Sequence, residues 1–295
     1  MVELYPVIKL NEPTILDTWK GLALNCLVVR LQDLICPRSM RLNSTFFKIK
    51  EKGGIHNFLD FDGKIILSLI MKDNLIQGFN PSRYSEVINT LKPDYYTIVD
   101  GETYEKEELI SKAEIKRSFL ETRQLIELCK DSKPIGQVKG CNKSQIVTHM
   151  ALLKSLGIED FVFHVGDFFR NGSPKMINRA KEYSLMIRKN AKTLILYGMG
   201  SQSKLQEFSF ADAYTTFNYF VNAVNGKKFV GTKKYHYTGG YSPKIVRENL
   251  IQIIKNIANM KKQTKLIIGG VCPWEAEQEE TGQVTLEQEL VQATL

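Results

Sequence analysis

Polar residues follow apolar stretches at several points along this chain, and their types could serve chemistry. Carboxylates at such points can act as nucleophiles or as proton donors and acceptors. A lysine directed into a buried site needs a carboxylate partner or an anionic ligand, because an unpaired buried ammonium group is costly. The candidate residues, all expected at the carboxyl ends of strands, are Ser68, Asp100, Gln137, Lys139, His164, Gly166, Asp167, Gly198, Gly200, Asp212 and Thr215.

Each candidate also has a purely structural interpretation. Asp100 precedes Gly101, and Asp-Gly is a strong turn signal. His164 could be a hydrogen-bonded core histidine. Gly198 and Gly200 could only permit a turn into the next helix, although a helix amino terminus there could also bind an anion. These alternatives stay open at the level of sequence.

The elements that must position these residues alternate between apolar runs and amphipathic segments. Expected strands cover residues 24–31, 64–71, 94–100, 134–140, 160–168 and 192–200. Expected helices cover 81–92, 111–130, 143–157, 173–190 and 242–262, with a short helix at 201–209. Such alternation predicts a parallel sheet, and six to eight units favour a closed (β/α)8 TIM-like barrel, an α/β fold, over an open sheet. No GxGxxG motif follows the first strand, which counts against a dinucleotide-binding fold.

Composition indicates a single globular domain, expected to span residues 1–272. Hydrophobic residues make up 43% of the 295 residues and charged residues 24%. No apolar run is long enough for a transmembrane helix and no signal-peptide pattern opens the chain, so a cytoplasmic location without membrane contact is expected. The five cysteines are dispersed without a CxxC pair, which predicts neither a disulfide framework nor a zinc site.

Charge is distributed unevenly along the chain. Residues 273–295 contain six Glu and no Lys or Arg, and are expected to form an acidic tail that is disordered or folds over a basic face. The remaining residues hold 40 Lys and Arg against 26 of the 32 Asp and Glu, an excess of 14 positive charges. Such a body favours a polyanionic partner such as nucleic acid, although a solvated basic surface without a partner is the alternative.

The order of motifs resembles that of the tRNA-guanine transglycosylases, a family that includes relatives acting on DNA. The matching segments are GGIHNFLDFDGKIILS (53–68), FNPSRYSEVINTLKPDYYTIVD (79–100), PIGQVKG (134–140), FVFHVGD (161–167) and LILYGMGSQSKLQEFSFADAYTT (194–216). Together they fall within residues 50–225. The resemblance implies a TIM-like barrel that exchanges guanine for a 7-deazaguanine, such as a preQ-type precursor. In that reaction an aspartate attacks the ribose C1′ and holds the sugar covalently.

The resemblance also implies roles for particular residues. Asp100 would bind the Watson–Crick edge of the base, Gly166 would offer backbone contacts, and Gly198 with Gly200 would shape the pocket wall. The full set of expected base-binding residues is Asp100, Gln137, Lys139, His164, Gly166, Asp167, Gly198 and Gly200.

The chain departs from the family pattern at the positions that matter most for chemistry. Thr215 stands where the family has its nucleophilic aspartate, and Asp212 lies three residues earlier. Ser68 stands near the position at which the family keeps a second aspartate. Lys139 replaces a glutamine, although Gln137 lies on the same strand face. The family's cysteine and histidine zinc motif is absent, so no cofactor is expected, and an added RNA-binding domain of the archaeal type is not expected either.

Three hypotheses follow. The first is a divergent exchange enzyme acting on DNA or tRNA, with Asp212 and Asp100 as catalytic residues. The second is an inactive relative that binds a base or nucleic acid as the partner subunit of an active paralogue. A homodimer or a heterodimer with a paralogue is the expected assembly. The third is an unrelated barrel enzyme acting on a phosphorylated metabolite, with Lys139 and Gly198 at an anion site. Of these, the active enzyme is the favoured hypothesis.

Overall fold

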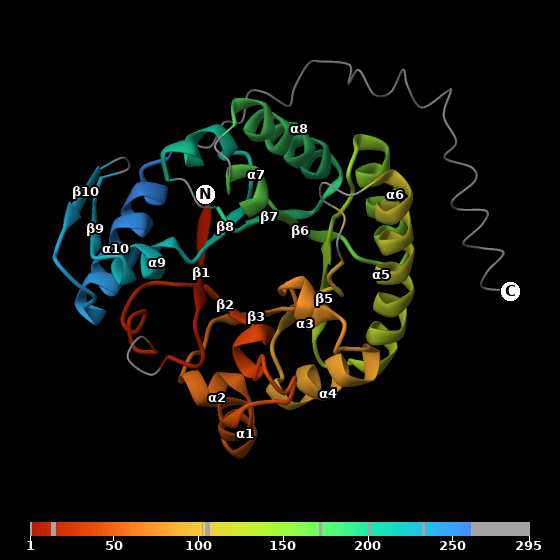
Figure 1. Cartoon of the computed structure of the whole chain (residues 1–295), viewed down its shortest axis with the longest axis horizontal. Helices are drawn as coiled ribbons and strands as arrows, with labels where there is room; N and C mark the ends of the chain where they lie inside the picture. The colour runs from red at the N-terminus through yellow and green to blue at the C-terminus, as the bar shows by residue number, and fades with distance from the viewer. Residues whose placement is uncertain are drawn as a thin grey trace, which may run out of the picture.

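Eight parallel strands form a closed barrel in the computed structural model, which describes residues 2–12, 16–101, 103, 107–170, 173–199, 202–231 and 234–260. The strands run in chain order around the ring, and β8 closes it by pairing with β1, with Glu3 opposite Ala213 (Figure 1). The predicted (β/α)8 TIM-like fold is therefore confirmed. The strands are β1 (Glu3–Ile8), β2 (Cys26–Arg30), β3 (Lys64–Ser68), β4 (Tyr95–Thr97), β5 (Lys133–Gln137), β6 (Asp160–His164), β7 (Thr193–Tyr197) and β8 (Ala213–Thr216).

Helices surround the barrel, and a small hairpin lies at its rim beyond α10 (Figure 1). The helices are α1 (Ser44–Glu51), α2 (Ile55–Leu59), α3 (Asp73–Ile76), α4 (Pro81–Leu91), α5 (Glu108–Leu128), α6 (Lys143–Ser155), α7 (Gly166–Arg170), α8 (Pro174–Asn190), α9 (Asn218–Val224) and α10 (Pro243–Ala258), with 3₁₀ segments η2 (Leu31–Leu34) and η3 (Gln202–Phe208). The hairpin pairs β9 (Lys227–Val230) with β10 (Lys234–Tyr237) in antiparallel fashion.

Side-chain caps fix where the crossover helices begin. The Asn80 side chain accepts a hydrogen bond from the Arg83 N–H at 2.9 Å at the start of α4. The Asn142 side chain does the same for the Gln145 N–H at 2.9 Å at the start of α6. Such caps satisfy amide groups that have no partner within the helix. They place each helix directly after the loop that leaves the preceding strand.

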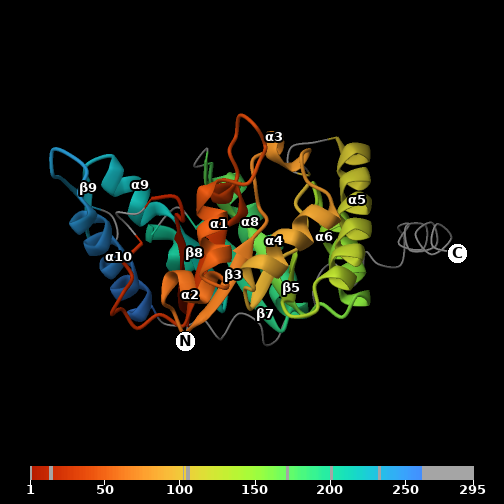
Figure 2. The same cartoon turned by 90° about the horizontal axis from the view of Figure 1, so that it is seen from below.

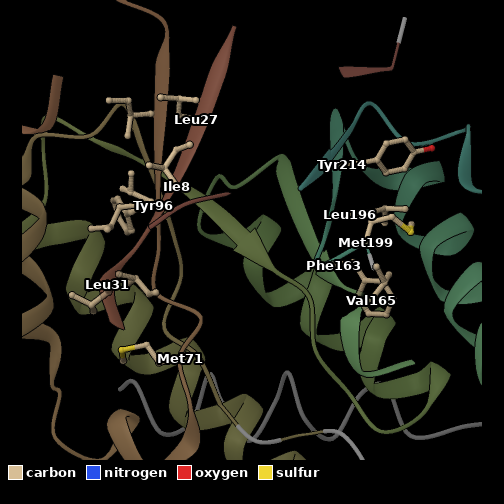
Figure 3. Packing of buried hydrophobic residues seen from close by; sticks show 14 of the residues in the cluster. Ile8, Leu27, Leu31, Met71, Tyr96, Phe163, Val165, Leu196, Met199 and Tyr214 are labelled. Carbon is tan, nitrogen blue, oxygen red and sulfur yellow. The ribbon is translucent and has the colours of Figure 1, made fainter. Parts of the chain in front are cut away.

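The apolar core has two layers, because side chains alternate between the two sides of each strand. One layer fills the barrel and comes from Val7, Cys26, Val28, Ile66, Ile135, Val162, Ile195 and Ala213. The other lies between strands and helices. Figure 3 shows part of this outer layer, with Ile8, Leu27 and Tyr96 on one side of the barrel and Phe163, Leu196 and Tyr214 on the other.

Most of the predicted strands end three or four residues early, and the strand at 160–168 is the case in which a helix replaces the missing part. Residues 160–168 were expected to be extended, but β6 stops at His164 and α7 begins at Gly166. The apolar run continues into α7, where Phe168 packs against Phe163 at 5.7 Å between ring centroids, so hydrophobicity alone does not mark the boundary. Residues 261–272 of the expected domain and the acidic segment 273–295 lie outside the described residues. Over the described part of the chain, no helix is long and apolar enough to cross a membrane.

Candidate functional site

A layer of polar side chains tops the apolar interior at the carboxyl ends of the strands. We call this end of the barrel, with the loops that follow the strands, the mouth. By strand alternation its inward positions continue the interior layer two residues beyond Val28, Ile66, Ile135, Val162, Ile195 and Ala213. These positions are Arg30, Ser68, Gln137, His164, Tyr197 and Thr215.

Asp100 and Lys139 form a buried ion pair at the mouth. Their relative exposures are 4% and 3%, and Lys139 Nζ donates to Asp100 Oδ1 and to the carbonyl oxygen of Gly101. Asp100 Oδ1 also accepts from the Gly101 N–H at 2.9 Å and from Gln137 Nε2 at 3.2 Å, and Oδ2 accepts from the Met71 N–H at 3.0 Å. The lysine therefore has a carboxylate partner, and four protein donors already engage the Asp100 carboxylate.

Gln137 leaves one acceptor at the mouth unsatisfied. Its side chain is fully buried, and its Oε1 atom has no hydrogen-bond partner among the described residues. A buried acceptor without a donor costs about 1–3 kcal/mol. An N–H or O–H group of a ligand, or a water molecule, would satisfy it.

His164 lies against two glycines. A Cβ atom built on Gly166 would lie 2.9 Å from His164 Nε2, and one built on Gly198 would lie 3.1 Å from the same atom. The imidazole also makes an edge contact with Tyr197, with 5.5 Å between ring centroids. The structure therefore brings His164, Gly166 and Gly198 together, and both glycines leave room for the ring.

Thr215 and Asp212 lie toward opposite ends of β8. Thr215 is 1% exposed near the mouth, and its Oγ1 accepts from the Gly198 N–H at 3.0 Å. Asp212 precedes the strand, and its carboxylate accepts from the Leu194 N–H at 3.0 Å and lies 3.4 Å from Arg188 Nη2. The predicted location of Asp212 at a carboxyl strand end is wrong. The strand starts after it, so about 10 Å of strand separates it from Thr215.

Sequence reasoning missed a second ion pair at the mouth. Arg30 Nη2 lies 2.7 Å from Asp33 Oδ1, and Arg30 Nε donates to Asp33 Oδ2 at 3.1 Å. The guanidinium carbon also lies 4.5 Å from the ring centroid of Phe217. Burial raises the pKa of the Asp33 carboxyl, and the attraction of Arg30 only partly opposes this. An arginine at the end of a strand with an aspartate three residues on was the available signal.

Ser68 bonds to another mouth residue. Burial raises the pKa of the Tyr197 hydroxyl, and a side-chain hydrogen bond with Ser68 opposes that shift. Ser68 itself is fully buried. Near the position where the resembled family has a second aspartate, this chain therefore has a neutral hydroxyl that contacts Tyr197.

His149 on α6 anchors the backbone of Lys139 from behind. Its Nδ1 accepts from the Lys139 N–H at 3.0 Å, and its Nε2 has no hydrogen-bond partner in the part of the chain described here. Burial, with a smaller contribution from the positive charge of Lys139, lowers the pKa of His149 from 6.5 to about 3. The imidazole is therefore neutral in the folded protein near pH 7.

This burial predicts a stability that declines in mild acid. The unfolded chain takes up a proton on His149 near pH 6.5 and the folded protein only near pH 3. Neutral His149 therefore makes its full contribution to the free energy of unfolding above pH 6.5. Below that pH the contribution falls, and about 2–3 kcal/mol is lost by pH 4.5. Urea unfolding above pH 6.5 and at pH 4.5 measures the loss. His149→Asn, which keeps an acceptor near the Lys139 N–H, should lose less stability between them; an equal loss in both proteins would contradict the prediction.

Two expected site residues cannot be placed. Gly200 lies outside the described residues, and the side chain of Asp167 is likewise not described. Among the residues that the structure describes, no group of three or more His, Cys, Asp or Glu side chains could hold a metal ion. No protein-family model matches the chain, and no curated protein is significantly similar to it.

Proposed function

We propose that this protein is a transglycosylase-type barrel that binds a nucleobase in nucleic acid without exchanging it covalently. The observation that carries the proposal is the arrangement of β8, with Thr215 near the mouth and Asp212 bound to Leu194 at the opposite end. Covalent exchange needs a carboxylate within reach of the ribose C1′. A threonine whose hydroxyl accepts from the Gly198 amide does not meet that need.

The state of Asp100 supports the same conclusion. A base-exchange reaction needs a second group that can give and take protons. The Asp100 carboxylate is engaged by Lys139, Gln137 and two backbone amides. Three of these donors contact Oδ1 and one contacts Oδ2, and Asp100 is only 4% exposed, so little of the carboxylate is open to a base. This geometry suits a fixed structural and electrostatic role better than proton transfer.

What the mouth offers instead is recognition. The unsatisfied Gln137 Oε1 suits an N–H donor, and purine and pyrimidine edges carry such donors. A base taken out of its stack is commonly read by hydrogen bonds to that edge. In this proposal the barrel holds a base and serves as the partner subunit of a paralogue that carries the nucleophile.

Salt dependence of binding tests the nucleic-acid part of the proposal. The excess of positive charge outside 273–295 predicts binding to labelled tRNA or DNA that weakens steeply with salt. With about three phosphate contacts, affinity should fall about 20-fold for a single strand and about 40-fold for a duplex between 50 and 200 mM monovalent salt. Fluorescence anisotropy measures this, and absent or salt-independent binding would contradict the proposal.

A further inference from the structure

The hairpin of β9 and β10 carries exposed tyrosines and lysines that the barrel site does not use. Tyr235 and Tyr237 are 49% and 70% exposed. Residues 225–247 contain six Lys and Arg residues and no Asp or Glu. Large aromatic rings are usually buried, because their contact with water is unfavourable. Exposed tyrosines within a basic segment that lacks acidic residues therefore mark a candidate contact surface.

Strand register places the two rings and one lysine on the same side of the hairpin. Tyr237 pairs with Lys227 and Tyr235 with Phe229, and directly opposed residues in an antiparallel pair point to the same face. Lys227 Nζ lies 5.5 Å from the ring centroid of Tyr235 and 5.7 Å from that of Tyr237. One ammonium group thus lies against two exposed rings.

We call this face of the hairpin the platform; Phe229 lies on it beside the two tyrosines, and hydrogen bonds tie its strand β9 to α10. Phe229 is 6% exposed and contacts the Tyr235 ring at 5.4 Å between centroids. Asn249 of α10 accepts from the Phe229 N–H at 2.7 Å and donates to the Lys227 carbonyl at 2.9 Å. Lys228 pairs with Glu248 of α10 at 2.9 Å. The platform is therefore anchored to the barrel's outer helix while its tyrosines remain open.

The platform lies toward the mouth end of the barrel. Figure 2 shows α9 and β9 on the flank of the barrel, toward the end that carries α3. α9 starts two residues after β8 ends, so the chain passes from Thr216 through α9 to the hairpin within one short segment. A strand of nucleic acid on the platform can therefore continue toward the mouth.

We propose that the β9–β10 hairpin is a stacking platform for single-stranded nucleic acid, with Tyr235 and Tyr237 against two bases and Lys227 against the intervening phosphate. Aromatic rings beside a positive charge are the chemistry that binds unpaired bases without sequence preference. A base-paired duplex hides its base faces and offers only phosphates. The inference rests on the proposed binding of nucleic acid and adds where, and in which form, the strand is held.

Tyrosine variants of the full chain test the platform. Binding of a fluorescein-labelled oligothymidylate and of the corresponding duplex is measured by anisotropy for wild type, Tyr235→Ala and Tyr237→Ala. Each substitution should weaken single-strand binding about tenfold and leave duplex binding nearly unchanged. The Tyr235→Phe and Tyr237→Phe variants keep the rings and should bind as wild type does. Phe47→Ala removes an exposed ring on α1 and serves as the matched control.

Lys227→Met tests the contribution of the charge to binding separately from that of the rings. It should reduce the slope of log affinity against log salt by about 0.7 for a single strand, whereas the tyrosine variants should leave that slope unchanged. Wild-type binding that the alanine variants do not alter would overturn the platform but not the proposed function. No binding by wild type would overturn both. A wild-type dimer that the alanine variants dissociate, with strand binding intact, would make the hairpin a protein interface and overturn the platform.

Discussion

Replacing Lys139 with methionine should destabilise the protein by about 3–5 kcal/mol, the largest effect expected of any single substitution at the mouth. Methionine fills similar space but leaves the Asp100 carboxylate, 4% exposed, without its cation. A buried charge that has lost its partner costs far more than the intact pair contributes. Urea unfolding at pH 7 measures the change.

A double variant distinguishes the loss of the ion pair from a general packing defect in the core. Asp100→Asn with Lys139→Met removes both charges, while the asparagine oxygen can still accept from a backbone amide. The double variant should be more stable than Lys139→Met alone. If Asp100→Asn lowers the stability of the Lys139→Met protein by as much as it lowers that of wild type, the two groups are not coupled and the described ion pair is wrong.

Gly198→Ala is expected to cost about 2–5 kcal/mol. Gly198 has φ +78°, a conformation that costs an alanine about 1–2 kcal/mol. The added Cβ would also lie 3.1–3.2 Å from two atoms of the His164 ring and 3.3 Å from Gly166 Cα, and such overpacking adds about 1–3 kcal/mol. Thermal or urea unfolding gives the difference from wild type.

Gly157 offers a matched control for this prediction. Its φ is +79°, but a Cβ there would meet no atom within 4 Å. Gly157→Ala should therefore cost only the backbone strain, and the excess cost of Gly198→Ala reports the crowding against His164. In a His164→Ala background that excess should shrink. An unchanged excess would show that the ring does not fill the space beside Gly198.

Most of the barrel was predictable because parallel strands buried on both sides are apolar throughout. The first strand was not among the predicted elements, since Pro6 and Glu3 interrupt its pattern, yet residues Glu3–Ile8 pair with both β2 and β8. The β9–β10 hairpin was also missed, although two short runs around Gly231 were an available signal.

The positions of the site residues could be predicted better than the contacts between them. The sequence indicated that Lys139 needs a carboxylate or an anion, but only the fold pairs it with a residue 39 positions away. The location of Asp212 failed for a different reason. The residues on both sides of it are apolar, so periodicity does not show where the short strand β8 begins. The role of Asp212 depended on that boundary.

We propose above that the barrel binds nucleic acid but performs no covalent base exchange. The most direct test is single-turnover incubation with labelled guanine or 7-deazaguanine and either tRNA or DNA, beside Asp212→Ala and Asp100→Ala. We predict no label in the nucleic acid with wild type, while salt-sensitive binding is retained. Label incorporation by wild type that is lost in Asp212→Ala would contradict the claim and return the nucleophile to Asp212.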